Sequence, residues 1–249
     1  MNRPDTRPGQ HNGPDRIINV VLHERTRWVF EHLPPSCDRL LDAGCHDAAG
    51  TRAFSARTRW AVGIDVDVDA LRRGQRRQPT VGLAAASGAA LPFRDAVFDC
   101  VVFSEVIEHV PAALEAQCIS ELHRVLRPGG TLILTTPHYG RFWWLDPLMA
   151  KTHVRRLLNR IRARRIALKG HKHYRVAELR ELLAESFEIE HVERPGQVLY
   201  PLAYWGHLLP FGIGRLPTLL GLWQRMMDID YTHEYGDAAY NVCIVARAR

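Results

Sequence analysis

The chain has 249 residues, of which 46% are hydrophobic, enough to build the core of one large α/β domain. Its five cysteines are odd in number and include no CxxC pair, which argues against a disulfide framework and a zinc site. No run of about 18 apolar residues occurs, so we expect no membrane span. These features predict a cytoplasmic protein without a bound metal.

The net charge of +6 is concentrated in one segment. Residues 151–172 hold nine Lys and Arg residues and no acid, which leaves 24 basic and 27 acidic residues elsewhere. The apolar residues of this segment fall on one helical face. A basic amphipathic helix of this kind suits a membrane surface, a phosphorylated substrate or nucleic acid. The ordinary alternative is a lid helix whose apolar face covers the core.

Residues 1–16 are rich in Pro, Gly and charge and predict a disordered tail. From there to residue 137, apolar runs typical of buried strands alternate with helical patterns. This alternation predicts an α/β fold with a parallel, doubly wound sheet and right-handed crossovers. The expected strands are 39–44, 60–66, 97–105 and 131–137, the expected helices are 17–33, 48–58, 69–78 and 111–126, and a turn is expected at 127–130.

Two segments interrupt the pattern of the second half. One, about 141–172, is aromatic and then basic, and the other, about 197–235, is apolar but broken by Pro and Gly. Because no internal repeat and no clear linker occurs, we expect residues 17–249 to form a single domain with these two insertions. A further helix and two strands are expected at 176–186, 187–193 and 240–248.

The first two strands end in residues suited to a nucleoside. In an open parallel sheet, ligands bind beyond the carboxyl ends of the strands. Gly44 follows the first strand and lets the backbone approach a ligand, because it has no Cβ. Asp65 ends the second strand, 23 residues after Asp42, where a carboxylate can accept both hydroxyls of a ribose. The ordinary alternative for Asp65 is a loop acid without a ligand.

Five short motifs in a fixed order support the nucleoside interpretation. LDAGC, GID, LPFRDAVFD, EVIEH and LRPGG follow one another between residues 41 and 130. In this order they resemble the type 11 family of class I S-adenosylmethionine-dependent methyltransferases. The resemblance covers about residues 37–137 and returns weakly at 170–193. It implies a Rossmann-like methyltransferase fold, with a mostly parallel seven-stranded sheet and an antiparallel last strand, and S-adenosyl-L-methionine as the cofactor.

The resemblance also implies which residues contact the cofactor. The first glycine turn should line the methionine end, the end of the second strand the ribose and adenine, and the end of the fourth strand the rim. His109, which closes EVIEH, is expected to pack and cap locally. The implied cofactor-binding residues are Asp42, Gly44, Cys45, Asp65, Val66, Ser87, Gly88, Phe103 and Ser104.

Two departures from the family pattern concern the same pocket. His46 and Ala48 stand where the family usually has its second and third glycines, and Ser87 stands where it often has an Asp for the adenine amine. Ala48 costs little if its φ is negative, and His46 can point its side chain away while its N–H faces the ligand. Family drift, a weakened or lost cofactor site, and a direct role of the imidazole all stay open.

Methyl transfer needs alignment more than a fixed set of catalytic groups, because the cofactor already carries its leaving group. A base helps when the acceptor is a hydroxyl. His138 and Tyr139 follow the fifth strand and are the natural base candidates, and His171 aligns with a family histidine that precedes the next helix. Each has the alternative of an ordinary loop hydrogen bond.

The aromatic part of the second insertion favours an apolar or lipid-linked acceptor over nucleic acid, unless it is a packed insertion or a homodimer face. We therefore expect S-adenosylmethionine-dependent methyl transfer, to an oxygen of a small-molecule or lipid-linked acceptor, with peripheral membrane contact through 151–172 as one use of the basic segment. A catalytically degenerate cofactor-binding or scaffolding relative is the alternative. A nicotinamide dehydrogenase ranks last, since it needs a GxGxxG run that the sequence lacks.

Overall fold

The computed structural model describes residues 20–77, 79–141, 172–196 and 226–249. The predicted tail, most of both predicted insertions and His171 lie outside these residues. Among the helices of the described residues, none is long and apolar enough to cross a membrane.

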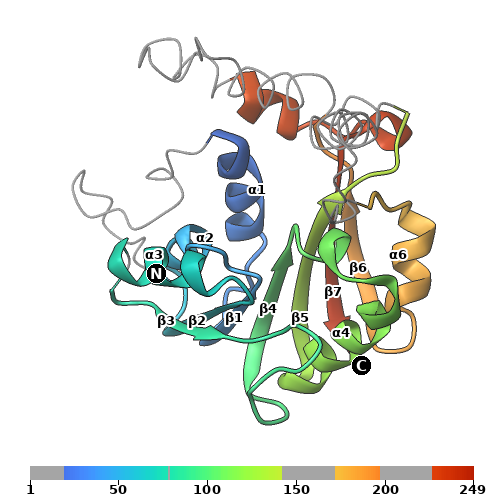
Figure 1. Cartoon of the computed structure of the whole chain (residues 1–249). Coiled ribbons are helices and arrows are strands. Elements are labelled where there is room, and N and C mark those ends of the chain that lie inside the picture. Colours follow the sequence, from blue (N-terminus) through green and yellow to red (C-terminus); the bar gives the residue numbers. More distant parts are fainter. Residues whose placement is uncertain (1–19, 78, 142–171, 197–225) are drawn as a thin grey trace, which may run out of the picture.

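A single seven-stranded sheet forms the centre of the molecule, in the order β3-β2-β1-β4-β5-β7-β6 (Figure 1). Neighbouring strands pair in parallel except β7, which is antiparallel to both β5 and β6. This confirms the mostly parallel sheet with an antiparallel last strand. The strands are β1 Arg39–Ala43, β2 Trp60–Asp65, β3 Gly82–Ala85, β4 Phe98–Ser104, β5 Leu126–Pro137, β6 Phe187–Glu193 and β7 Asn241–Ala248.

Helices cover both faces of the sheet because the central strands are apolar on both sides. Leu40, Cys100 and Ile133 pack with Trp28 on one face, and their neighbours along the strands pack with the helices of the other face. This is the doubly wound arrangement that the alternation predicted. The described helices are α1 Val20–Glu31, α2 Ala49–Phe54, α3 Val68–Arg77, α4 Ala112–Val125 and α6 Val176–Leu183, with short 3-10 turns η2 Ile107–His109 and η5 Gly236–Ala238.

Two details differ from the sequence-based expectation. β3 was not predicted, because its four residues, Gly-Leu-Ala-Ala, are too few to carry a clear strand pattern. The turn predicted at 127–130 is instead a bulge inside β5: Leu126 pairs with Phe98 and Thr131 with Cys100, so four residues oppose Asp99 alone. An ion pair between Arg127 and Asp99 closes this bulge.

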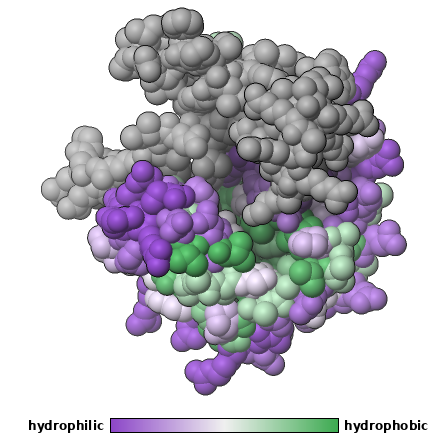
Figure 2. Space-filling view, in the orientation of Figure 1, coloured by the Kyte–Doolittle hydropathy of each residue, from purple (hydrophilic) through white to green (hydrophobic). Residues whose placement is uncertain are grey.

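The surface follows the usual division between apolar and polar residues. On the face shown in Figure 2, apolar residues gather toward the middle and hydrophilic residues occupy much of the periphery. Among the described residues, the large apolar side chains with the most exposure include Val66 and Val68, which follow β2 at the edge where its carboxyl end lies.

Candidate active site

A cavity of about 680 Å³ lies beyond the carboxyl ends of β1, β2 and β4. Its volume falls in the range of small-molecule and cofactor sites. The lining comes from the turn after β1, the end of β2, the loop after β3 and the end of β4, together with α1. We call it the donor pocket. Eight of the nine residues predicted to bind the cofactor line it: Asp42, Gly44, Cys45, Asp65, Val66, Gly88, Phe103 and Ser104.

The turn after β1 is held against β2 by main-chain hydrogen bonds. The N–H groups of Gly44 and Cys45 both donate to the carbonyl oxygen of Ile64, at 2.7 and 2.9 Å. Gly44 has φ +92°, and a Cβ there would lie 2.2 Å from Cγ2 of Val106. Only glycine fits this position, for both its conformation and its space. The glycine is therefore required by its conformation and by the nearby Val106 side chain, and the predicted approach of its backbone to a ligand stays a prediction.

Asp65 is positioned by two backbone groups. Its Oδ2 accepts a hydrogen bond from the N–H of His46 at 2.8 Å, and its Oδ1 accepts one from the N–H of Asp67 at 2.8 Å. A carboxylate offers about four lone-pair positions, so both oxygens can still accept hydroxyl groups. The carboxylate is thus held in place in the lining of the donor pocket, and its contact with a ribose stays a prediction.

His46 and Ala48 both have a left-handed backbone, with φ 49° and 61°. The condition under which Ala48 would cost little, a negative φ, is therefore not met. The N–H of His46 donates a hydrogen bond to Oδ2 of Asp65 at 2.8 Å, and a contact of this N–H with a ligand stays a prediction. The imidazole of His46 is 64% exposed. A non-glycine residue in this region costs roughly 1–2 kcal/mol, which the bond to Asp65 helps to offset.

Asp42 lies at the base of the donor pocket and is almost completely buried. Burial is the main cause that raises the pKa of its carboxyl group to about 7. A hydrogen bond from the Thr51 hydroxyl, at 2.5 Å, partly opposes this rise, and the nearby charge of Asp65 adds to it. Asp42 therefore titrates near neutrality, where a bound cation would favour its ionised form.

The charge of the donor pocket opposes that of the whole chain. Five acids and no Lys or Arg stand among the described residues that line it. Asp47 pairs with Arg77 at 2.9 Å, and Glu105 pairs with Arg25 of α1. The other three acids of the lining are Asp42, Asp65 and Asp67, of which Asp67 lies near the charge of Arg73. Such a lining fits a ligand that carries positive charge, as the sulfonium and ammonium groups of S-adenosylmethionine do.

Ser87 is the one predicted cofactor residue that the structure does not place in the lining. Its Oγ accepts a hydrogen bond from the N–H of Ala89 at 3.2 Å, which closes a local turn. Its neighbours Ala86 and Gly88 do line the pocket. A contact between Ser87 and the cofactor stays a prediction.

The lining residues that were not foreseen as cofactor contacts include Thr26, Phe54 and His109. Thr26 comes from α1, outside the motifs, and no pattern in its sequence indicates a ligand. Phe54 was expected only as part of a helix. His109 was expected to act locally, yet it also lines the donor pocket. The position of His109 at the end of EVIEH was the signal that could have identified it.

His138 and Tyr139 border a different cavity, of about 500 Å³, together with Arg175 and Arg194. The N–H of His138 donates to the carbonyl oxygen of Tyr240 at 2.7 Å, and its Nδ1 lies 3.3 Å from the carbonyl oxygen of Ala239. Burial lowers the pKa of His138, so its imidazole is neutral at pH 7. The structure does not bring either residue into the lining of the donor pocket, and their catalytic roles stay predictions.

Glu108 is a buried acid beside the donor pocket that the sequence reasoning did not single out. Its Oε2 accepts a hydrogen bond from the Thr136 hydroxyl at 3.1 Å, and its Oε1 has no hydrogen-bond partner. Burial, followed by the charge of Glu105, raises the pKa of Glu108 well above its usual value. Burial therefore favours the protonated form, which can donate a hydrogen bond, over a wider pH range than in an exposed glutamic acid.

Comparisons with known proteins agree with this geometry. Residues 41–134 match the type 11 family model, which describes a methyltransferase domain. A probable S-adenosylmethionine-dependent methyltransferase from Mycobacterium tuberculosis (strain ATCC 25618 / H37Rv) is 33% identical over 135 residues, which cover 53% of this chain and 48% of that protein. A demethylmenaquinone methyltransferase from Mycobacterium sp. (strain KMS) is 38% identical over 101 residues, 39% of this chain and 40% of that protein.

The solved structure of geranyl diphosphate methyltransferase in complex with S-adenosylmethionine shares the fold, with a TM-score of 0.62 over 98% of this chain and 93% of that chain, at 15% sequence identity. This chain spans about half the length of the curated relatives named above, or less. The range that the family model matches, residues 41–134, includes β2, β3 and β4 and the turn after β1.

Proposed function

We propose, from the premise that residues 41–134 belong to the type 11 family of class I S-adenosylmethionine-dependent methyltransferases, that the whole chain transfers a methyl group from this cofactor to an acceptor. The observation that carries the proposal is the acid-lined donor pocket, with Gly44 at its turn and Asp65 fixed at its rim. When bound, the cofactor supplies a methyl group on a positively charged sulfur that leaves as a neutral thioether.

Different residues of the donor pocket would bind different parts of the cofactor. We assign the ribose hydroxyls to Asp65 and the adenine to Val66 and Gly88, which follow β2 and β3. Asp42 and the turn at Gly44 would hold the methionine end, where the negative lining favours the ammonium group. The chain's own contribution to rate is then alignment and the field of these carboxyl groups.

Titration calorimetry on the full chain tests the donor pocket. S-adenosylmethionine and S-adenosylhomocysteine should both bind, and Asp65→Asn should weaken binding about tenfold or more, because a charged acceptor of two hydroxyls is lost. The matched control is Asp69→Asn, an exposed acid in the first turn of α3. Absence of binding at millimolar concentrations of either nucleoside would refute the proposal.

For the acceptor, we propose an oxygen of a small-molecule or lipid-linked compound. The support is the aromatic and basic composition of the two segments that lie outside the described residues, and one relative is named for a demethylmenaquinone acceptor. Co-sedimentation with anionic and neutral vesicles tests peripheral membrane contact through residues 151–172. Binding to neither vesicle would remove the lipid-surface part of this proposal and leave a free small molecule.

His138 is the proposed base for a hydroxyl acceptor, and this role can be tested separately from cofactor binding. His138→Ala should lower turnover and leave the affinity for S-adenosylmethionine unchanged, because His138 lies outside the lining of the donor pocket. Unchanged turnover at saturating acceptor would exclude the base role. Exposed His233, whose Nδ1 lies 2.7 Å from the carbonyl oxygen of Ile229, offers the control His233→Ala.

A second candidate is a relative that binds the cofactor without transferring its methyl group. The observation that favours it is the left-handed backbone at His46 and Ala48, where the family usually has glycine. This candidate predicts cofactor binding in calorimetry but no methyl transfer to any acceptor of a broad panel. Transfer to one acceptor would exclude it.

A further inference from the structure

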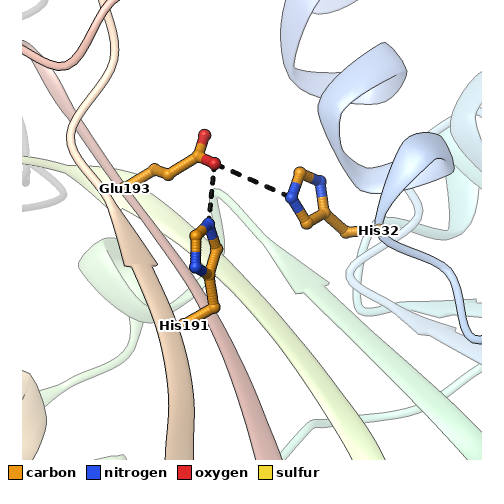
Figure 3. A group of neighbouring side chains, drawn as sticks. All are labelled: His32, His191 and Glu193. Atoms are coloured by element: carbon orange, nitrogen blue, oxygen red, sulfur yellow. Dashed lines mark hydrogen bonds and ion pairs between the residues drawn. The ribbon is translucent and has the colours of Figure 1, made fainter.

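Three side chains converge at a point outside the donor pocket, between the end of α1 and strand β6 (Figure 3). His32 directly follows α1, and His191 and Glu193 lie two residues apart on β6, on the same face of the strand. The Nε2 of His191 lies 2.7 Å from Oε1 of Glu193, and the Nε2 of His32 lies 3.8 Å from the same oxygen. All three ligand atoms are within 4.8 Å of one another.

The surrounding groups orient these atoms toward one another. Nδ1 of His32 is 2.8 Å from the carbonyl oxygen of Trp28, an acceptor, so this nitrogen carries the proton and leaves the lone pair on Nε2. The indole N–H of Trp28 donates to Oε2 of Glu193 at 2.5 Å, which leaves Oε1 for the cluster. Metal-binding histidines and carboxylates are held by just such outer hydrogen bonds.

The close contact of His191 with Glu193 needs a proton on Nε2 of His191. A bound cation would take the place of that proton, which would leave to solvent.

We propose that His32, His191 and Glu193 bind one divalent transition metal ion, with Zn²⁺ as the best fit. Two imidazole nitrogens and one carboxylate oxygen suit Zn²⁺ better than Ca²⁺ or Mg²⁺, which prefer oxygen ligands. Zn²⁺ bonds of about 2.0–2.2 Å in tetrahedral geometry place ligand atoms roughly 3.4 Å apart. The two distances to Oε1 lie on either side of this value. The rings of His32 and His191 are stacked with their centroids 5.6 Å apart, so metal binding requires the imidazoles to rotate about their side-chain bonds.

The site is reachable from solvent. The side chains of His32, His191 and Glu193 are 28%, 47% and 35% exposed, which leaves room for water as the fourth ligand. The cysteines of the described residues are all buried and offer no competing thiolates at the surface. Histidines outside the cluster could still take up metal, so the test needs variants at the cluster itself.

Metal at this site would fasten α1 to the far edge of the sheet. α1 also supplies Thr26 to the lining of the donor pocket and Arg25 to the ion pair with Glu105. The ion would therefore steady the helix that borders the donor pocket, although it lies outside the pocket itself. This role is separate from methyl transfer and does not depend on it.

The test uses the full chain, freed of metal by a chelator, without an affinity tag and in the absence of S-adenosylmethionine. Calorimetry with ZnCl₂ at about pH 7.5 should show one equivalent bound, together with a rise in Tm. His191→Gln and His32→Gln should each lose this equivalent and the rise in Tm. His123→Gln and His233→Gln, two histidines elsewhere on the described surface, are the matched controls and should keep both.

Co²⁺ supplies an independent readout that does not rely on stability. The Co²⁺-loaded chain should show visible absorption typical of four- or five-coordinate nitrogen and oxygen ligands, and Glu193→Gln should abolish or shift it. Circular dichroism identifies a variant that has failed to fold. In that case the metal binding of the other two ligand variants tests the proposal. Zn²⁺ uptake that is absent from the unmodified chain, or equal in the chain and all three variants, would overturn the proposal.

Discussion

Asp42 has a carboxyl group that titrates near the pH at which most enzymes work. Burial raises its pKa to about 7 in the ligand-free protein. A cation bound in the donor pocket would stabilise the ionised form and release the proton. The residue at the base of the pocket thus links cofactor affinity to pH.

We expect the affinity for S-adenosylmethionine to rise between pH 6 and 8, by up to about tenfold per unit below the pKa, because only ionised Asp42 attracts the cation. Calorimetry across this range measures the slope. Asp42→Asn should give a flatter slope, while Asp69→Asn in the first turn of α3 should keep the original one. Equal slopes in the original chain and Asp42→Asn would show that another group governs binding.

Ala48 carries a backbone conformation that its side chain opposes. With φ 61°, the residue lies in the left-handed region, where glycine has no steric penalty. Ala48→Gly should therefore raise the free energy of unfolding by up to about 1 kcal/mol in chemical denaturation. Ala113→Gly, in the exposed first turn of α4, should instead lower it by roughly 0.5–1 kcal/mol. A loss of stability in Ala48→Gly would contradict the inference that the left-handed backbone of Ala48 is strained.

The sequence identified several pocket residues but not their backbone conformations. Gly44 and Asp65 could be predicted because they end strands in a recognisable order. The left-handed φ of His46 could not, because it is supported by a hydrogen bond to Asp65, 19 residues further along the chain. Interactions between distant residues are not visible in local patterns. The same reason explains Ser87, whose hydroxyl is used by the turn that follows it.

Helix α3 packs against the turn that forms one wall of the donor pocket, and Gly74 is the residue of α3 at this contact. A Cβ on Gly74 would lie 2.7 Å from the carbonyl oxygen of Asp47, in the turn that forms the pocket wall. A backbone atom cannot move aside as a flexible side chain can. The close packing of α3 against this turn thus depends on the missing side chain.

Gly74→Ala tests this packing. In an ordinary helix the change stabilises by about 1 kcal/mol, but here we expect a lower Tm and weaker binding of S-adenosylmethionine, because the pocket turn must shift. The matched control is Gly82→Ala in β3, where the nearest atom to the new Cβ is 3.6 Å away. The control should leave Tm unchanged or slightly higher. A rise in Tm for both variants would show that the turn can move without cost.

Elements with strong patterns were predicted closely, and elements that depend on partners were not. β6 has the predicted bounds, and β4 differs by one residue at each end, because both are apolar runs between clear breaks. β3 was missed because it joins the sheet only through its pairing with β2. The role of α1 at the donor pocket could not be foreseen, since the helix lies outside the motifs and reaches the pocket only through the tertiary fold.

At the scale of the whole molecule, the buried carboxyl group of Glu108 makes the stability of the fold depend on pH. Glu108 is buried and holds its proton to a higher pH than it would in the unfolded chain, because burial raises its pKa. The folded state therefore binds more protons between the two pKa values. The contribution of Glu108 to the free energy of unfolding is therefore complete at low pH. It declines as the pH rises above the pKa that Glu108 has in the unfolded chain.

Glu108→Gln should remove this decline, since glutamine mimics the protonated acid. We expect the variant to gain stability over the original chain at pH 8 and to match it near pH 4, each unit of pKa difference being worth about 1.4 kcal/mol. Urea unfolding at both pH values measures the effect. The exposed variant Glu185→Gln should show no such trend. A constant difference at all pH values would assign the effect to packing instead.

β7 has a consequence for the order in which the sheet is completed. It follows every other strand along the chain, yet it lies between β5 and β6. Until residues 241–248 have been synthesised and have entered this gap, β6 has no strand to join and β5 keeps an open margin of unpaired amide and carbonyl groups. Nascent or truncated chains that stop before residue 241 would therefore be prone to associate with one another through these two margins.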